Sequence, residues 1–263
     1  MSSFYVIRDG GKERGRGTLC AGSWSMSWYK LLPLLKTAGH VATAIDLASC
    51  GIYSMDANQI QTWSDLNEPL IRLFNSLPPQ EKVILVGYNM GGMSLSLMME
   101  QFPDKIKAAV FLTAFMPLSG SSAMEMISEV LARLYSWGDT EFIMGESGIP
   151  TSFKFGPAFS WQMLYQNSPT EDIELGELLK RKFPIIQGEV VFSQERYGRV
   201  PRVYVVTKDD NAIWEELQRK MIAENSPDRV YEMEGSDHSA FFCYPHRLAE
   251  ILDEISSSYN GIY

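Results

Sequence analysis

The sequence predicts an α/β fold with a mostly parallel sheet, and three observations support this. Short apolar runs typical of buried strands alternate along the chain with helix-like amphipathic segments. The apolar run 83–86 leads directly into a Gly-x-x-x-Gly turn, and a helical pattern follows from Met93. The 263 residues suffice for one large α/β domain with an insertion. We therefore expect helices on both faces of the sheet.

The strands and helices are expected in a regular order. Residues 4–7 predict a short first strand, which a polar, glycine-rich stretch follows as far as residue 17. Residues 26–38 have helical spacing and stop at Gly39, a residue suited to a helix C-cap. The remaining core elements are strands over 41–47, 83–86, 106–112, 203–207 and 230–233, and helices over 63–77 and about 245–259.

Between residues 118 and 198 the alternation gives way to short helical pieces rich in Met, Trp, Phe and Tyr, such as 155–165. We expect this segment to form a mainly helical cap inserted over the active site, so that 1–117 and 199–263 form the core. Any single aromatic residue of the cap is expected to pack against the core. Together they should line an apolar cavity, because small-molecule sites lie where loops leave the strand ends.

Composition excludes several classes of partner. With 32 acidic and 23 basic residues the net charge is −9, and no Lys/Arg run could neutralise phosphates. We therefore expect neither nucleic acid nor a membrane as a partner. The first 17 residues contain no apolar core of a signal peptide, and no stretch of 18 apolar residues follows. We expect a soluble, cytoplasmic protein.

The three cysteines, Cys20, Cys50 and Cys243, are far apart and show no CxxC or other metal-binding spacing. We expect reduced, buried thiols. No motif predicts a cofactor or a metal.

Residues 83–92, VILVGYNMGG, have the strand, turn and helix context of a nucleophile elbow. The central residue of that motif is a serine, but here it is Asn89. The lone pair of an amide nitrogen is delocalised into its carbonyl, and a base cannot turn it into a nucleophile as it turns a hydroxyl into an alkoxide. Acyl transfer through Asn89 is therefore chemically implausible. Asparagine tolerates left-handed backbone angles, which allows the turn to survive the change.

The triad of α/β-hydrolases has a fixed order along the chain: the elbow comes first, an acid follows a late strand, and a histidine lies in a later loop. Asp209 and Asp210 follow the strand 203–207, and His238 follows the strand 230–233. The order is kept while the nucleophile is lost. We therefore expect an α/β-hydrolase fold.

Nearly the whole chain resembles the plant methylesterase and hydroxynitrile lyase family, which also contains alkaloid-pathway esterases and a decarboxylating methylketone synthase. The resemblance implies that His238 is the catalytic histidine and that Asp210 is the triad acid, because Asp210 preserves the spacing to Glu216. The stretches that carry the resemblance are Ser27 to Leu31, Gly39 to Leu47, Glu81 to Gly87, Ala109 to Leu112, Arg196 to Gly198 and Gly235 to His238.

The chain departs from the family pattern at the elbow and at the oxyanion loop. The family elbow reads Gly-His-Ser-x-Gly-Gly, whereas this chain has Tyr88 and Asn89. The family stretch His-Gly-x-x-His-Gly is missing, and an ungapped match places Ala21 at the oxyanion position. If the first strand is instead 4–7, the loop carries an insertion and the donor lies near Gly10.

Backbone donors survive side-chain substitution, so the N–H of Met90 is expected to remain an oxyanion donor. With His238 oriented by Asp210, proton transfer and oxyanion stabilisation remain without covalent catalysis. Tyr88 is a further polar candidate, for which a packing role is the favoured alternative. His40 and His246 are assigned no chemistry.

The leading hypothesis is a non-hydrolytic enzyme of plant specialised metabolism that cyclises or isomerises a small apolar carbonyl or enol substrate. A cyclase acting on a monoterpene enol to give an iridoid lactol is a concrete version. The alternatives are a 3-oxo acid decarboxylase, residual methylesterase or hydroxynitrile lyase activity, and a non-catalytic ligand-binding protein. The sequence leaves a homodimer open as the oligomeric state.

Overall fold

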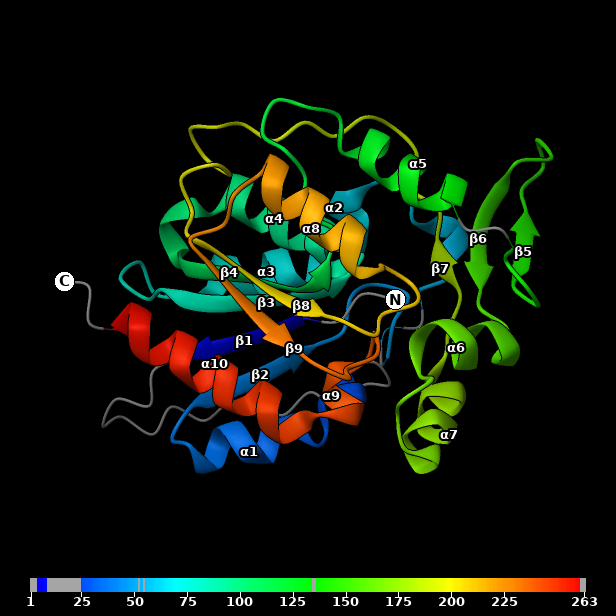
Figure 1. The fold of residues 1–263 in the computed structure, drawn as a ribbon. Coiled ribbons are helices and arrows are strands. Elements are labelled where there is room, and N and C mark those ends of the chain that lie inside the picture. Colours follow the sequence, from blue (N-terminus) through cyan, green and yellow to red (C-terminus); the bar gives the residue numbers. More distant parts are fainter. Residues whose placement is uncertain (1–3, 9–24, 52, 54, 134–135, 261–263) are drawn as a thin grey trace.

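The computed structural model describes residues 4–8, 25–51, 53, 55–133 and 136–260. Within these residues, six strands form one sheet in the order β2-β1-β3-β4-β8-β9, with helices on both faces (Figure 1). The strands are β1 (Phe4–Arg8), β2 (Val41–Ile45), β3 (Val83–Asn89), β4 (Ile106–Ala114), β8 (Arg202–Thr207) and β9 (Arg229–Met233). The expected mostly parallel sheet with helices on both faces is confirmed.

The helices of the core follow the amphipathic segments of the sequence only in part: of the helix expected over 26–38, only Leu31–Thr37 is α-helical, after a 3₁₀ turn at Ser25–Trp28. Helices α1 and α10 pack together on one face of the sheet, while α3, α4 and α8 lie on the other (Figure 1). Among the described residues, no helix combines the length and the apolarity needed to cross a membrane. The core helices are α1 (Leu31–Thr37), α2 (Trp63–Leu66), α3 (Glu68–Ser76), α4 (Gly91–Gln101), α8 (Glu215–Glu224), α9 (Ala240–Cys243) and α10 (Pro245–Asn260), with 3₁₀ turns at Ser25–Trp28, Ala57–Gln59 and Pro103–Lys105.

Two expectations about the core need correction. The helix expected over 63–77 is broken at Asn67, and Pro69 stands in the first turn of α3. Proline has no N–H to continue the hydrogen-bond ladder, so α2 ends where α3 begins. Helix α8 was not expected.

The first strand has the expected position but the opposite direction. β1 is antiparallel to both β2 and β3: Phe4 pairs with Gly87, and Arg8 pairs with Val41. The pairs β3 with β4, β4 with β8, and β8 with β9 are parallel. The carboxyl end of β1 therefore lies at the edge of the sheet opposite to Asn89.

The segment between β4 and β8 lies beyond the carboxyl ends of the parallel strands (Figure 1). It contains the helices α5 (Ala123–Arg133), α6 (Pro157–Leu164) and α7 (Thr170–Leu179). It also contains a three-stranded antiparallel sheet of β5 (Glu141–Met144), β6 (Pro150–Lys154) and β7 (Phe183–Pro184), which was not expected. Strands this short show too little alternation to be recognised. We refer to residues 118–198 as the cap.

Candidate active site

The elbow is built by close packing of backbone at two glycines. A Cβ at Gly92 would lie 1.9 Å from the carbonyl oxygen of Phe115, and one at Gly87 would lie 2.8 Å from that of Gly91. Strand β3 and helix α4 can therefore meet in a tight turn only with glycine on either side. Between them Asn89 has φ of 54°, the left-handed region that asparagine tolerates better than most residues.

The Asn89 side chain is held in one orientation by its neighbours. The N–H of Met90 donates to Asn89 Oδ1 over 2.5 Å, and Asn89 Nδ2 contacts Nε2 of His238. A backbone N–H can only donate, so the amide oxygen must face Met90 and the amide N–H groups must face the imidazole. His238 Nε2 then accepts, and the contact requires a neutral imidazole with its proton on Nδ1. The amide of Asn89 thus engages both Nε2 of His238 and the expected oxyanion donor, the N–H of Met90.

Asp210 holds the other side of the imidazole. Its Oδ2 lies 2.7 Å from His238 Nδ1 and accepts from the Thr113 hydroxyl at 2.5 Å and the Thr207 hydroxyl at 2.9 Å. Its Oδ1 accepts two backbone N–H groups, from residues 212 and 213, each over 2.8 Å. Both side chains of the His238–Asp210 pair are fully buried. These donors hold the carboxylate in one orientation, and its contact with Nδ1 fixes the imidazole tautomer.

Of the two adjacent acids, the structure brings Asp210 to His238 and leaves Asp209 exposed. Thr113 and Thr207 were not singled out from the sequence, although both stand at the carboxyl ends of strands. Thr113 also has a positive φ of 35°. Their position after buried apolar runs is the one signal that could have suggested a role.

Tyr88 packs beneath the site and is not one of the described residues that line the cavity, so its position fits the packing alternative. Its hydroxyl lies 3.1 Å from the Ser239 hydroxyl, and its ring centre lies 4.7 Å from that of His238 and 5.0 Å from that of Phe241. Burial raises the pKa of the Tyr88 hydroxyl well above its ordinary value. The phenol therefore stays protonated and supports the imidazole from the core side.

The second oxyanion donor cannot be placed on the described residues. Ala21 and Gly10 both lie outside them. The end of β1 lies at the edge of the sheet away from Asn89, as the antiparallel pairing of Phe4 with Gly87 and of Ile7 with Ile84 requires. In the parallel arrangement expected of this fold, the loop after the first strand would begin beside the elbow instead.

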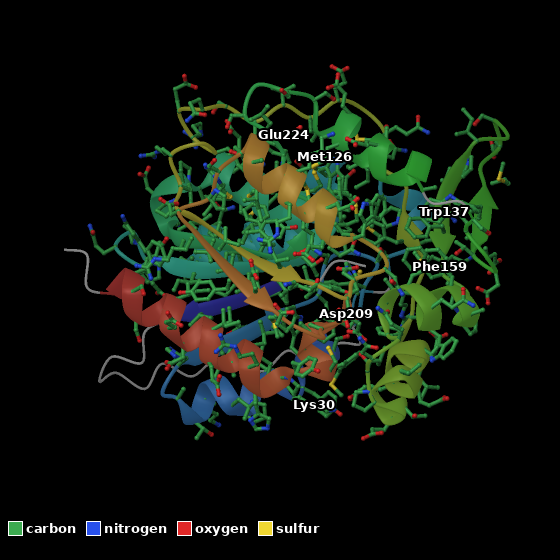
Figure 2. The ribbon with its side chains drawn as sticks, in the orientation of Figure 1. Lys30, Met126, Trp137, Phe159, Asp209 and Glu224 are labelled. Carbon is green, nitrogen blue, oxygen red and sulfur yellow. The ribbon has the colours of Figure 1, made fainter. Side chains whose placement is uncertain are left out.

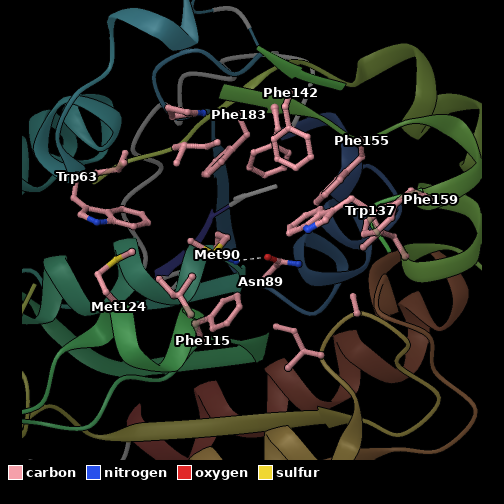
Figure 3. Close-up of a pocket in the computed structure, with 18 residues that line it drawn as sticks. Trp63, Asn89, Met90, Phe115, Met124, Trp137, Phe142, Phe155, Phe159 and Phe183 are labelled. Carbon is pink, nitrogen blue, oxygen red and sulfur yellow. Dashed lines mark hydrogen bonds between the residues drawn. The ribbon is translucent and has the colours of Figure 1, made fainter. Parts of the chain in front are cut away.

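A cavity of ≈ 190 Å³ opens above Asn89 and Met90, between core and cap (Figure 3). Its described walls include no charged side chain, and the polar groups of the lining side chains are the amide of Asn89 and the indole N–H groups of Trp63 and Trp137. Its size is below the usual range for drug-sized ligands, which points to a small occupant. The aromatic walls are Trp63, Phe115, Trp137, Phe142, Phe153, Phe155, Phe159 and Phe183.

Cap aromatics build most of one wall of this cavity. Phe155 and Phe159 are stacked with ring centres 4.6 Å apart, and Trp137 stacks on Phe159 at 5.9 Å. Figure 3 shows these three rings on one side of Asn89, with Trp63 and Met124 on the other. Within the described part of the chain, no cluster of three or more His, Cys, Asp or Glu residues could hold a metal ion.

The two described cysteines carry free thiols. Cys50 is buried as expected, whereas Cys243 is only partly buried. Cys20 lies outside the described residues.

Comparison with known proteins assigns the family. Residues 16–251 match the model of the alpha/beta hydrolase family. The chain is 43% identical to methylesterase 8 of Arabidopsis thaliana over 245 residues, which cover 92% of this chain and 88% of that protein. This chain is a member of the α/β-hydrolase family.

The chain is similar to the methylesterase-like branch of the α/β-hydrolases. The chain is 38% identical to an alpha-hydroxynitrile lyase of Arabidopsis thaliana, over 90% of this chain and 94% of that protein. A solved structure of a tomato methylketone synthase I variant, complexed with beta-ketoheptanoate, superposes with a TM-score of 0.84. It is 36% identical and covers 92% of this chain and 95% of that one. By their names, these three relatives are an esterase, a lyase and a synthase.

Proposed function

We propose that this α/β-hydrolase is a non-hydrolytic enzyme that moves a proton on a small, neutral, apolar carbonyl or enol substrate. One observation carries the proposal: an amide, Asn89, stands at the elbow in contact with a histidine that a buried carboxylate orients. An amide cannot form an acyl-enzyme, but a neutral imidazole can accept and return a proton near neutral pH.

The geometry suggests how substrate would enter this arrangement. A substrate oxygen that takes the place of Asn89 Oδ1 at the Met90 N–H would be stabilised as it becomes an enolate or alkoxide. Asn89 would then turn aside and free Nε2 of His238 to move the proton. Its amide N–H groups remain available as donors to the same oxygen.

The apolar cavity favours a substrate without charge. A carboxylate buried there would have no cation among the described cavity walls, and an unpaired charge in an apolar site is costly. Cyclisation or isomerisation of a neutral terpenoid carbonyl or enol needs only proton transfer, with no atom added or lost. An iridoid-type lactol formed from a monoterpene enol is the concrete version that we propose.

Deuterium incorporation from D₂O tests the proposal without knowledge of the natural substrate. Probes would be small aldehydes, cyclic ketones and a monoterpene enol, followed by mass spectrometry and product analysis. We expect wild-type protein to exchange hydrogen next to the carbonyl, and His238→Ala to lose this activity by about 10²-fold or more. His246→Ala removes an exposed histidine of α10 and is the matched control.

Two results would contradict the proposal. If wild type leaves exchange and product distribution as in buffer, the protein does not catalyse this chemistry. Tight binding of the same probes by calorimetry would then favour a non-catalytic binding protein. An unchanged rate in His238→Ala would remove the imidazole from the mechanism.

Decarboxylation of a 3-oxo acid is the second candidate, which the likeness to the methylketone synthase structure with its bound 3-oxo acid favours. Loss of CO₂ leaves an enolate, which the same donors could stabilise. His238 Nε2 would take up a proton from water and pass it to the enolate carbon, which gives the ketone. This candidate predicts His238-dependent release of CO₂ from a medium-chain 3-oxo acid. Absence of CO₂ alongside deuterium exchange on neutral probes would exclude it.

A further inference from the structure

One segment of the cap is hydrogen-bonded to both loops that carry the acid and the histidine. Asn211, in the loop after β8, donates through Nδ2 to the carbonyl of Gln162 over 2.9 Å. Asn167 donates through Nδ2 to the carbonyl of Gly235, in the loop after β9, over 3.1 Å. Figure 2 shows Asp209 at this junction between the core and the helices of the cap. We call residues 162–168 the docking segment.

The carboxylate of Asp237 joins the docking segment to the histidine loop. Its Oδ2 accepts the N–H of Asn167 at 2.9 Å and the hydroxyl of Ser168 at 2.8 Å. Its Oδ1 accepts the N–H of Ser239 at 2.9 Å and contacts the thiol of Cys243 at 3.1 Å. One oxygen therefore faces the cap, and the other faces the core.

Burial of the Asp237 carboxylate costs free energy, and its hydrogen-bond partners require an acceptor at both oxygens. Asp237 is fully buried, and burial raises the pKa of its carboxyl. Its four donors are neutral N–H, O–H and S–H groups. Each oxygen accepts one backbone N–H, which cannot reverse its role, so an amide at this position must leave one of the two unpaired.

We propose that Asp237 is a positioning residue that holds His238 against Asn89 when the cap is docked. Asp237 and Ser239 stand directly before and after the histidine, and their mutual hydrogen bond spans it. The same carboxylate is completed by donors from the cap. Docking of the segment 162–168 and alignment of the imidazole are therefore coupled. This role rests on the proposed function, in which His238 carries the proton.

The test uses NMR on the intact chain, because no turnover is needed. Two signals are followed: the Nδ1 proton of His238 and the exchange rates of the amides of residues 167 and 168. In Asp237→Asn we expect the His238 signal to shift or broaden and the amides to exchange about tenfold faster or more. Asp209→Asn is the matched control, since it neutralises an exposed acid at the same junction, while the new amide oxygen can still accept the Nδ2–H of Asn167 that Asp209 Oδ2 accepts at 3.4 Å. It should leave the His238 signal in place.

Ser168→Ala keeps the proposal testable if Asp237→Asn does not fold. It removes one cap donor to Asp237 and substitutes no residue of the histidine loop. We expect a smaller change in the same His238 signal and faster exchange in the docking segment. An unchanged His238 signal in Ser168→Ala, or in a folded Asp237→Asn, would overturn the coupling. Absence of deuterium exchange on the carbonyl probes, with these NMR changes present, would reject the proposed function alone.

Discussion

Replacing Asn89 by serine should convert this protein into an esterase. The hydroxyl would stand where the Asn89 amide now contacts Nε2 of His238, and Asp210 already orients the imidazole as a base. Removal of Asn89 Oδ1 would also release the N–H of Met90 for the ester oxygen. Every part of the hydrolytic machinery that the described residues contain would then be in place.

The expected gain in the rate of ester hydrolysis follows from the base that Asn89→Ser brings back into use, the imidazole of His238. A positioned base contributes roughly 10²–10⁴-fold. We therefore expect hydrolysis of a small apolar ester, such as methyl hexanoate, to rise at least about 10²-fold in Asn89→Ser over wild type. The assay is release of acid and methanol at neutral pH.

The substitution also has a cost in stability. The amide makes two contacts, to His238 and Met90, of which serine can replace one, and a hydrogen bond contributes about 1 kcal/mol. Serine adopts the positive φ of this turn less readily than asparagine does. The free energy of unfolding should therefore fall by about 2 kcal/mol in total. In a domain of this size that lowers Tm by roughly 4–8 °C.

Two controls decide the outcome. Asn89→Ala lacks the hydroxyl, and Asn89→Ser with His238→Ala lacks the base, so both should hydrolyse the ester at the wild-type rate. A folded Asn89→Ser protein with no gain over Asn89→Ala would refute the reasoning. In that case the imidazole would not act on the residue at the elbow.

Three further predictions concern the framework of the site. Asn89→Ala should be less stable than Asn89→Gly by about 1 kcal/mol in urea unfolding, because both lose the amide but only alanine is strained at positive φ; equal stabilities would mean that the turn relaxes. Thr113→Val removes a hydroxyl donor to the buried Asp210 and should cost about 2 kcal/mol, again in urea unfolding, since hydrogen bonds to charged groups are strong; no loss would show that a water or a neighbour replaces it. Gly92→Ala places a Cβ 1.9 Å from the Phe115 carbonyl oxygen and should cost about 3 kcal/mol or more, and a wild-type unfolding midpoint would show that α4 can move away from β4.

Much of the core could be predicted from local patterns because strands and helices have their own periodicities. The buried run of β3, the turn and α4 appear in the sequence as contiguous signals. The direction of β1 could not be predicted, since a five-residue apolar strand pairs equally well either way until its neighbours are known. The cap sheet was missed for a similar reason, because its strands are two to five residues long.

The sequence by itself determined the elbow with Asn89 in place of the serine, the chain order of acid and histidine, and the apolar, aromatic character of the cap. Only the tertiary structure decided which acid meets His238, which way the Asn89 amide points, and that Asp237 receives two of its four donors from the cap. The physical reason is distance along the chain: Asn89 and His238 are 149 residues apart, and Asp237 and Asn167 are 70 apart. Hydrogen bonds of this kind depend on the orientation of single groups, which arises only when the sheet, the loops and the cap are packed together.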